Sequence, residues 1–245
     1  MQKEGWQLAE RPKYKRILLK LSGEALAGKK GTGLDFTVIR SVCEAIRRSR
    51  ESGVEIGIVV GGGNFWRGAR DVGWPMDRSR ADQIGMLATV MNGIALSDVL
   101  EQLGVPCVVQ TAVEMQRFAE PYSRRAVEAH FHHGEVIIFG CGTGHPFFST
   151  DTGAVLRALE IGADAILLAK NIDGVYSADP KVDPSAVRYD TISYEDVLAK
   201  KLRVIDATAA SLAMERRIPL LVFALSDPEN ILRVLAGEPL GTIVH

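Results

Sequence analysis

The stretch Arg16-Ile17-Leu18-Leu19-Lys20-Leu21-Ser22-Gly23 decides how this chain folds. Its apolar run is short and stops at Ser22-Gly23, a pattern typical of a buried strand that ends in a turn. A second apolar strand, 54–60, runs directly into Gly61-Gly62-Gly63. Both turns follow the carboxyl end of a strand, where their backbone N–H groups can bind phosphate, so we expect them to build one phosphate site.

Strands and helices alternate along the rest of the chain. The expected strands are 16–21, 54–60, 105–109, 135–139, 165–168, 219–223 and 241–244. The expected helices are 35–52, 80–103, 124–132, 151–161, 194–198, 206–216 and 228–236, and the segment 171–190 is expected to be an ordered loop. This alternation predicts an α/β fold, a three-layer αβα sandwich with a mainly parallel sheet and with ligands at the carboxyl ends of the strands.

The composition is that of an ordinary globular protein. The 245 residues fit one α/β domain, and a formal net charge of -1 gives no overall basic field for nucleic acid. The three cysteines form no CxxC pair, which predicts reduced thiols rather than a zinc site or disulfides. Residues 1–14 lack the apolar region of a signal peptide, and no apolar run approaches the roughly 20 residues of a membrane span. We therefore expect a cytoplasmic protein that binds neither nucleic acid nor membrane.

Lys20 lies at the end of the first strand, beside the turn that begins with Ser22. An ammonium group at this point can neutralise phosphate oxygens while the N–H groups of the turn donate hydrogen bonds. The alternative is a lysine whose stem covers the strand end and whose charge lies in water. The surrounding residues are not a Walker A motif, which requires GxxxxGK[ST], so local sequence leaves both interpretations open.

The second turn continues as Gly61-Gly62-Gly63-Asn64-Phe65-Trp66-Arg67-Gly68. Three successive glycines let a ligand approach the backbone closely, and Arg67 offers a planar fork for phosphate oxygens. A flexible turn with a surface arginine is the alternative, and it is less favoured because the glycines follow an apolar strand directly. The spacing is not GxGxxG, which disfavours a dinucleotide-binding fold.

Hydroxyl groups, aromatic rings and a carboxylate occur together in Thr143-Gly144-His145-Pro146-Phe147-Phe148-Ser149-Thr150-Asp151. The segment joins a strand to a helix, so Thr150 or Asp151 is expected to cap the helix, whose N-terminus can also bind an anion. His145 is a weak candidate for a general base, because phosphoryl transfer depends on positioning more than on a base.

Three further segments have ordinary interpretations. Asp173-Gly174-Val175-Tyr176-Ser177-Ala178-Asp179-Pro180 contains Asp-Gly and Asp-Pro turn formers, so spacing alone favours a plain loop over a clamp for a nucleotide base. Met86-Leu87-Ala88-Thr89-Val90-Met91-Asn92 is more typical of the core of a helix than of a ligand site. Arg47-Arg48-Ser49-Arg50 is more typical of a solvated helix end than of a patch for nucleic acid.

Taken together, these motifs resemble those of the bacterial uridylate (UMP) kinases. The similarity rests on residues 14–26, 61–68, 85–93, 142–148 and 173–180, and it runs in order from about Tyr14 to Thr242. It implies the amino-acid-kinase fold with an eight-stranded sheet, in one domain of residues 14–245 after a polar extension of residues 1–13. It also implies transfer of the γ-phosphoryl group of ATP to UMP with Mg²⁺, a homohexamer, and activation by GTP and inhibition by UTP in pyrimidine nucleotide (CTP and UTP) synthesis.

The resemblance also assigns roles to individual positions. The implied catalytic residues are Lys20, Arg67, Asp151 and Asp206; the two carboxylates would orient the lysine and Mg²⁺, and no residue is assigned as a direct metal ligand. The implied ATP-binding residues are Lys20, Leu21, Ser22, Gly23, Gly63, Arg67, Lys170, Asn171, Tyr176 and Asp179. The implied UMP-binding residues are Gly62, Asp82, Thr143, Gly144, His145, Pro146, Phe147, Phe148, Ser149 and Thr150. The family links activation by GTP to the segment that is Gly28-Lys29-Lys30-Gly31-Thr32-Gly33 in this chain.

Some alternatives stay open at this stage. Lys170 and Asn171 lie where the family varies, so both are candidates for contact with ATP. A second hypothesis is a kinase of the same fold that phosphorylates a carboxylate or a carbamate, such as acetylglutamate. The segment 143–150 and the Met-rich helix argue against it. A non-catalytic nucleotide-binding protein is a third, and the presence of Lys20, Arg67 and Asp151 argues against that.

Overall fold

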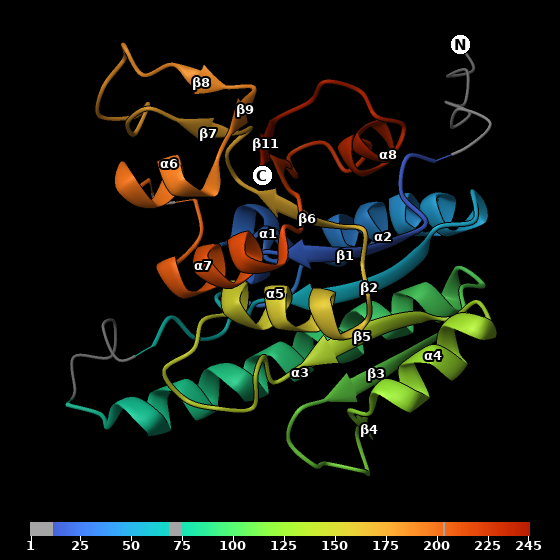
Figure 1. Cartoon of the computed structure of the whole chain (residues 1–245). Helices are drawn as coiled ribbons and strands as arrows, with labels where there is room; N and C mark the ends of the chain where they lie inside the picture. The colour runs from blue at the N-terminus through green and yellow to red at the C-terminus, as the bar shows by residue number, and fades with distance from the viewer. Residues whose placement is uncertain (1–11, 69–74, 203) are drawn as a thin grey trace.

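The computed structural model describes residues 12–68, 75–202 and 204–245, so most of the expected N-terminal extension lies outside the described residues. The described strands form one nine-stranded sheet and a separate pair, β7 and β8 (Figure 1). The strands are β1 (Arg16–Leu21), β2 (Glu55–Val60), β3 (Cys107–Thr111), β4 (Glu120–Pro121), β5 (Val136–Gly140), β6 (Ala165–Lys170), β7 (Val175–Tyr176), β8 (Arg188–Tyr189), β9 (Thr191–Ile192), β10 (Leu220–Ala224) and β11 (Thr242–Val244). The helices are α1 (Gly23–Leu26), the 3₁₀ turn η1 (Gly28–Lys30), α2 (Phe36–Glu51), α3 (Arg78–Gln102), α4 (Arg124–His132), α5 (Thr150–Glu160), α6 (Tyr194–Ala199), α7 (Ala207–Arg216) and α8 (Asn230–Leu235).

The large sheet has the strand order β4-β3-β5-β2-β1-β6-β10-β11-β9. Every neighbouring pair in it is parallel except β10 and β11. The predicted α/β sandwich with a mainly parallel sheet is therefore confirmed. The implied count of eight strands is wrong for the described residues, because even the two-residue segments β4 and β9 pair with the edges of the sheet and bring it to nine strands.

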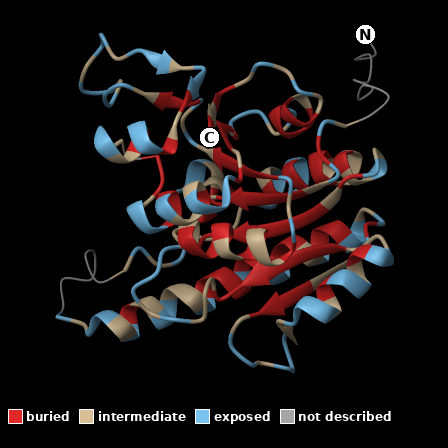
Figure 2. Cartoon of the chain, viewed as in Figure 1, coloured by how far each residue is buried: buried red, intermediate tan, exposed pale blue. Residues whose placement is uncertain are grey.

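The sheet is buried between two layers of helices (Figure 2). Helices α2, α3 and α8 cover one face, and α4, α5, α6 and α7 cover the other. Side chains alternate between the two faces of a strand. Along β1, Ile17, Leu19 and Leu21 accordingly pack on the α2 side, while Leu18 packs on the α5 side. Lys20 lies two residues after Leu18 and therefore on the same face of the sheet, so the strand directs its side chain toward α5.

Helix α2 shows how local sequence sets the ends of the elements. Asp35 accepts a hydrogen bond from the backbone N of Thr37 at 3.0 Å and caps the helix, as the sequence predicted. Ile39, Val42 and Ile46 form its buried stripe. After the helix, Gly53 has a φ of 89°, a left-handed conformation that suits glycine, and the chain then turns back into β2.

Helix α3 has 25 residues and a mean hydropathy of 1.3 over its most apolar 18-residue window. Among the described helices it alone is long and apolar enough to cross a membrane. One side of α3 packs on β2, β3 and β5, and half of the window is buried in the protein. A core helix has the same length and composition, so α3 is weak evidence for a membrane segment.

The segment between β6 and β9 is more regular than the sequence predicted. The expectation of an ordered loop over 171–190 is wrong in part, because β7 and β8 pair in antiparallel fashion there, with Val175 opposite Tyr189. Each strand has only two residues, too few to give a periodic pattern that the sequence could reveal.

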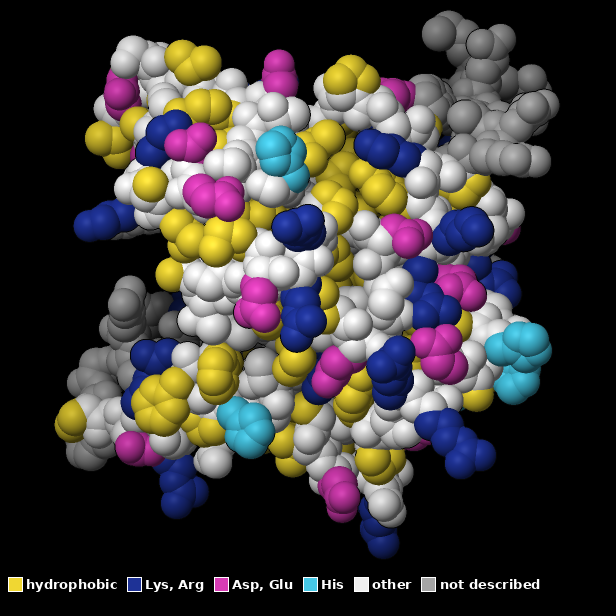
Figure 3. All heavy atoms as spheres, in the orientation of Figure 1, with side chains coloured by type: hydrophobic (Ala, Val, Ile, Leu, Met, Phe, Trp, Pro, Cys, Tyr) yellow, Lys and Arg dark blue, Asp and Glu magenta, His cyan; other side chains and the backbone are white. Residues whose placement is uncertain are grey.

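The surface carries charges of both signs. On the face shown in Figure 3, lysine and arginine side chains are interspersed with aspartate and glutamate side chains, and neither sign dominates. This distribution agrees with the net charge of -1.

Candidate active site

The functional segments meet at the carboxyl edge of the sheet. Strands β5, β2, β1 and β6 are consecutive neighbours and run parallel, so the turns after them open at the same edge. The backbone N of Gly61 donates to the carbonyl of Leu21 at 3.0 Å, which holds the two glycine turns side by side. A Cβ on Gly23 would lie 2.2 Å from the carbonyl oxygen of Gly61, so only glycine permits this approach.

Two lysines and one carboxylate form the centre of this edge. Lys20 Nζ lies 2.8 Å from Asp151 Oδ1, and Lys170 Nζ lies 3.4 Å from Asp151 Oδ2. Lys170 ends β6, the strand next to β1, and has the parity of Ile166 and Leu168, which pack on the α5 side. Lys20 is only 9% exposed, so the alternative of a lysine whose charge lies in water is wrong. Neighbouring strands thus aim two ammonium groups at the first turn of α5.

The electrostatics of this centre follow from burial and charge. Burial alone would raise the pKa of the Asp151 carboxyl, but the ammonium groups of Lys20 and Lys170 outweigh it, and the pKa lies below its ordinary value. Burial lowers the pKa of Lys170; Asp151 opposes this effect and Lys20 adds to it. The site therefore keeps an ionised carboxylate between two amines and carries a net positive charge while both amines are protonated.

The first turn of α5 is held by a cap and by a second carboxylate. Ser149 accepts a hydrogen bond from the backbone N of Thr152 at 3.1 Å, so the predicted cap, Thr150 or Asp151, is wrong by one or two residues. The helix begins at Thr150, and Asp151 is thereby free to face the lysines. Asp206 caps α7 through the backbone N of Ala209 at 3.0 Å and also accepts hydrogen bonds from the hydroxyls of Ser149 and Thr152. Asp206 therefore fixes α7 against the start of α5.

A cavity of about 620 Å³ lies on the β2 side of this centre, between α3 and the segment after β5. Its walls combine glycines, hydroxyl groups and charged side chains. The lining residues are Glu24, Gly62, Gly63, Trp66, Arg67, Gly68, Arg78, Ala81, Asp82, Gly85, Met86, Thr89, Cys141, Gly142, Thr143, His145, Phe148, Ser149 and Thr150. We call it the α3 pocket.

Asp82 fixes the mouth of the α3 pocket. Its carboxylate accepts a hydrogen bond from the backbone N of Phe147 at 2.8 Å and pairs with Arg78 Nε at 2.9 Å. Phe147 has a φ of 73°, an uncommon conformation for a residue with a side chain, and the hydrogen bond to Asp82 helps to hold it. Asp82 thus joins α3 to the loop that closes the other side of the pocket.

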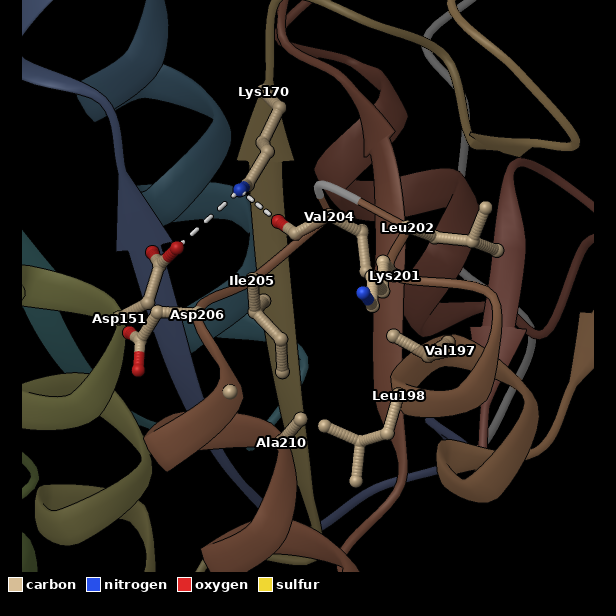
Figure 4. Close-up of a pocket in the computed structure, with 11 residues that line it drawn as sticks. Asp151, Lys170, Val197, Leu198, Lys201, Leu202, Val204, Ile205, Asp206 and Ala210 are labelled. Atoms are coloured by element: carbon tan, nitrogen blue, oxygen red, sulfur yellow. Dashed lines mark hydrogen bonds and ion pairs between the residues drawn. The ribbon is translucent and has the colours of Figure 1, made fainter.

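A second cavity, of about 480 Å³, lies on the other side of the centre, between β6 and helices α6 and α7 (Figure 4). Lys170, Asp151 and Asp206 form its polar end, and Lys170 Nζ also donates to the carbonyl of Val204. The remaining walls are mainly apolar. They are made of Val197, Leu198, Lys201, Leu202, Val204, Ile205, Ala207 and Ala210. We call it the α7 pocket.

Comparisons with known proteins agree with this geometry. Residues 15–224 match the model of the amino acid kinase family. A uridylate kinase from Pediococcus pentosaceus is 56% identical over 234 residues, which cover 95% of this chain and 97% of that protein. The chain belongs to the uridylate kinases of the amino acid kinase family.

Two solved structures extend the agreement to the fold of these kinases. The UMP kinase from Bacillus anthracis superposes with a TM-score of 0.92 at 39% identity, covering 96% of this chain and 97% of that one. The UMP kinase from Ureaplasma parvum gives a TM-score of 0.89 at 38% identity, with 94% and 98% covered. Membership in this family makes the chain a nucleoside monophosphate kinase, as the sequence predicted.

The structure brings most of the predicted acceptor residues of this kinase together. Gly62, Asp82, Thr143, His145, Phe148, Ser149 and Thr150 all line the α3 pocket. The other three, Gly144, Pro146 and Phe147, belong to the same loop without being among the lining residues, and Phe147 is 68% exposed. Their assignment to UMP stays a prediction.

The predicted ATP-binding residues are more dispersed. Lys170 lines the α7 pocket, whereas Asn171 is exposed and lies outside it. Gly63 and Arg67 line the α3 pocket, where Arg67 Nη2 lies 3.5 Å from Glu24 Oε1. The side chain of Leu21 is buried in the core, so only its backbone can reach a ligand.

Two other predicted ATP-binding residues, Tyr176 and Asp179, lie outside the linings of both pockets. Tyr176 Oη donates to Asp173 Oδ1 at 2.9 Å, which fixes the ring on β7. Asp179 Oδ1 accepts from the backbone N of Lys181 at 2.9 Å and so shapes the turn that follows. Both roles stay predictions.

The segment predicted to respond to GTP, residues 28–33, begins with the 3₁₀ turn η1. It lies beside the second glycine turn, because the backbone N of Gly33 donates to the carbonyl of Asn64 at 3.0 Å. None of its residues lines either pocket. It is therefore connected to the site through Asn64, which follows the three glycines.

Sequence reasoning missed one wall of the α3 pocket. Ala81, Gly85, Met86 and Thr89 lie one turn apart on α3, on the side that also carries Asp82. The interpretation of 86–92 as plain helix core is wrong for Met86 and Thr89, which line the pocket, and for Leu87 and Met91, which are 55% and 50% exposed. Their spacing of three, four or seven residues from Asp82 or from each other could have indicated that they share one side of the helix with it.

Cys141 is the other lining residue of note. Its backbone N donates to Thr89 Oγ1 at 2.8 Å, and its φ is 62°. Burial raises the pKa of the Cys141 thiol, so it is a packing group rather than a nucleophile. The sequence offered no signal for its position, because the contact with Thr89 joins segments 52 residues apart.

Proposed function

We propose that the protein transfers the γ-phosphoryl group of ATP to UMP, giving UDP and ADP. The observation that carries the proposal is the position of the N-terminus of α5. Ser149 and Thr150 line the α3 pocket, while Asp151 in the same turn lines the α7 pocket. Two ligands, one in each pocket, would therefore meet at one helix N-terminus beside Lys20. Positive charge at such a junction favours phosphate groups.

In this proposal the α3 pocket holds UMP and the α7 pocket holds the base end of ATP. The apolar walls from α6 and α7 suit an adenine ring, and the glycine turns suit phosphates. Gly62 would approach the acceptor phosphate, Asp82 the ribose, and the segment 143–150 the uracil. Ser22, Gly23 and Gly63 would donate backbone N–H groups to the donor phosphates. Arg67 would clamp phosphate, and its position in the α3 pocket beside Glu24 supports this role.

Lys20 is the proposed catalytic cation. Phosphoryl transfer spreads negative charge over the oxygens of the moving group, and catalysis comes mainly from positioning and electrostatic stabilisation. Lys20 is fixed by Asp151, so its charge is already oriented before substrates bind. Lys170 would act on the donor phosphates from the next strand, and Asp206 would act indirectly by holding α5 and α7 together.

Mg²⁺ is the proposed cofactor, bound together with ATP. The described residues contain no cluster of three metal-ligating side chains, but Asp151 and Asp206 line the same cavity. This donor set fits Mg²⁺, which is commonly held by one or two carboxylates plus the phosphates of its nucleotide. When bound there, the ion would neutralise part of the negative charge of the phosphates. The chain's own part would be to offer these carboxylates, and the ammonium groups of Lys20 and Lys170 favour the ionised form of Asp151.

We also propose the regulation and context that the family suggests. These are activation by GTP through residues 28–33, inhibition by UTP, a cytoplasmic location, a role in pyrimidine nucleotide synthesis and a single domain of residues 14–245. The contact of Gly33 with Asn64 supports the first, because it connects that segment to a phosphate turn.

A homohexamer is the proposed assembly, and the outer face of α3 supports self-association. Ile84, Leu87, Met91 and Ile94 are exposed and follow each other at three- and four-residue intervals. They form an apolar stripe opposite the pocket-lining side of the helix. Exposed Arg80 precedes the stripe and exposed Asp98 follows it, so two copies of α3 in antiparallel orientation would match in both shape and charge.

A coupled assay of purified protein with ATP and Mg²⁺ tests the proposed reaction. We expect release of ADP that depends on UMP, with CMP, dUMP and acetylglutamate as parallel acceptors. Turnover of UMP no faster than in buffer would overturn the proposal. Faster turnover of acetylglutamate than of UMP would favour the carboxylate-kinase alternative, and tight binding of ATP without turnover would favour a non-catalytic role.

A further inference from the structure

Two asparagines form a buried amide pair beneath the glycine turns. Asn64 follows Gly61–Gly63 and is 2% exposed, and Asn92 lies on α3 and is fully buried. Asn64 Nδ2 donates to Asn92 Oδ1 at 2.9 Å, and Asn92 Nδ2 donates to Asn64 Oδ1 at 2.8 Å. The two side chains therefore bind each other reciprocally.

The second N–H of each amide leaves the pair and binds a backbone carbonyl. Asn92 Nδ2 donates to the carbonyl of Gly61 at 2.7 Å, and Asn64 Nδ2 donates to the carbonyl of Gly33 at 2.7 Å. The pair also packs against the first turn, since a Cβ on Gly23 would lie 2.7 Å from Asn64 Oδ1. One pair thus contacts both phosphate turns and the segment 28–33.

All four amide N–H groups of the pair have an acceptor. Buried polar groups are costly unless they are bonded, and a fully bonded network fixes the groups that it joins. An apolar pair of similar volume would fill the same space but would leave the carbonyl of Gly61 free to rotate. The two amide side chains therefore affect the conformation of the turn at Gly61 as well as the packing beneath it.

We propose that Asn64 and Asn92 are positioning residues of the phosphate site. They hold the carbonyl of Gly61 away from the ligand, so that the N–H groups of the following glycines face the phosphates. The proposal rests on the proposed function and deepens it, because it names what orients the turn on which both substrates depend. Neither side chain lines a pocket, so both act through the backbone.

The test compares Asn64→Ala, Asn92→Ala and the double variant in the UMP-dependent assay. We expect each single variant to lower kcat/KM by about 10-fold or more, as displacement of a binding group by about 1 Å can cost up to roughly 100-fold. The two side chains act as a unit, so the double variant is expected to lose no more than about twice the larger single loss. The ratio of activities on UMP and CMP is expected to stay unchanged, because none of the pair's hydrogen bonds reaches the segment 143–150 that is proposed to hold the uracil.

Ser49→Ala is the matched control. Ser49 is also fully buried, and its hydroxyl donates only to the carbonyl of Ala45 in its own helix, at 2.8 Å. We expect full activity in this variant, with a melting temperature lowered by a few degrees, as for the single asparagine variants. If an alanine variant does not fold, Asn92→Ser replaces it, since the shorter side chain retains a donor but cannot reach both partners.

Binding of ADP, measured by calorimetry, separates this inference from the proposed function. We expect both asparagine variants to bind ADP at least about 10-fold more weakly than the wild type, and Ser49→Ala to bind it normally. A wild type that binds ADP but shows no UMP-dependent turnover would overturn the proposed function and leave the inference to be judged on ADP affinity. Single variants within twofold of wild type in both measurements, or losses that multiply in the double variant, would overturn the inference.

Discussion

The two pockets that flank the start of α5 differ in what builds their walls. The α3 pocket is made of the turn after β2, one side of α3 and the segment after β5, and two arginines, a glutamate and an aspartate line it. The α7 pocket is mainly apolar, and its polar end is formed by Lys170, Asp151 and Asp206. Hydrogen bonding can select a ligand in the first pocket, whereas apolar contact can mainly hold one in the second.

This difference indicates which parts of the site select the substrates and which part takes part in phosphoryl transfer. Among the described residues, the pockets have no lining residue in common, but they meet at the turn that starts α5, where Ser149 and Thr150 line one and Asp151, the partner of Lys20, lines the other. Changes at that shared point should therefore affect turnover with any pair of substrates, and changes farther out should affect one substrate at a time. The predictions below test this division, beginning at the shared point.

The largest effect is expected for Lys20→Met. Lys20 is the cation at the junction, so kcat should fall by at least ~100-fold, the scale of losing a principal electrostatic stabiliser. Steady-state kinetics and thermal unfolding measure activity and folding in the same samples. Lys15→Met removes an exposed lysine that precedes β1 and should keep full activity. Near-normal turnover by a folded Lys20→Met protein would remove Lys20 from the mechanism.

Lys170→Ala and Asn171→Ala distinguish the two candidates for contact with ATP. Lys170 lines the α7 pocket and pairs with Asp151, whereas Asn171 is exposed outside it. We expect Lys170→Ala to lower kcat/KM for ATP by about 20-fold and Asn171→Ala to change it by less than about twofold, since roughly 1.4 kcal/mol corresponds to tenfold. The reverse order of effects would assign the contact to Asn171.

Asp82→Ala and Leu198→Ala form a crossed pair, one in each pocket. Asp82→Ala should raise the KM for UMP by about 10-fold and leave the KM for ATP within twofold, because it removes a polar wall of the α3 pocket only. Leu198→Ala should raise the KM for ATP by about fivefold and leave the KM for UMP unchanged, because it removes apolar area from the α7 pocket. If either variant changed the KM for UMP and the KM for ATP equally, the two pockets would not bind the two substrates separately.

The smallest effect concerns the stability of the shared centre. The pKa of Asp151 lies below its ordinary value, so its stabilising contribution is complete above the unfolded-state pKa and is lost as the pH falls through the folded-state pKa. Asp151→Asn should therefore unfold more readily than the wild type at pH 7, by about 1 kcal/mol, and the difference should shrink below about pH 4. Urea unfolding between pH 3 and pH 7 measures this. A constant difference across that range would show that the Asp151 charge does not stabilise the fold.

Several features were predictable from local sequence because local interactions cause them. The run 16–21 is apolar throughout and is buried as predicted, and Asp35 caps α2 as its side chain favours. The glycines after β2 lie at the sheet edge because strand and turn are adjacent in the chain. The sequence also allows the prediction that Lys20 and Leu18 lie on the same face of the sheet. It does not indicate which helix covers that face.

Other features depend on contacts between distant segments, which local sequence patterns do not reveal. The α7 pocket is built by α6 and α7, whose residues carry no motif and approach Lys170 only through the packing of these helices beside β6. The amide pair joins residues 28 positions apart, and neither asparagine stands out in a helix or a turn. The cap of α5 was misplaced because Ser149, Thr150 and Asp151 are all good caps, and only the lysines on β1 and β6 decide which of them faces inward.

The sequence by itself determined the layered α/β fold and the location of the two glycine turns, because strand burial, helix capping and glycine turns arise from residues that are close in the chain. The family of kinases was indicated by the resemblance of its motifs. The tertiary structure decided which charges meet, which pocket has which walls, and which buried amides orient the turns. These depend on strand order and helix packing, which bring together side chains that no local pattern connects.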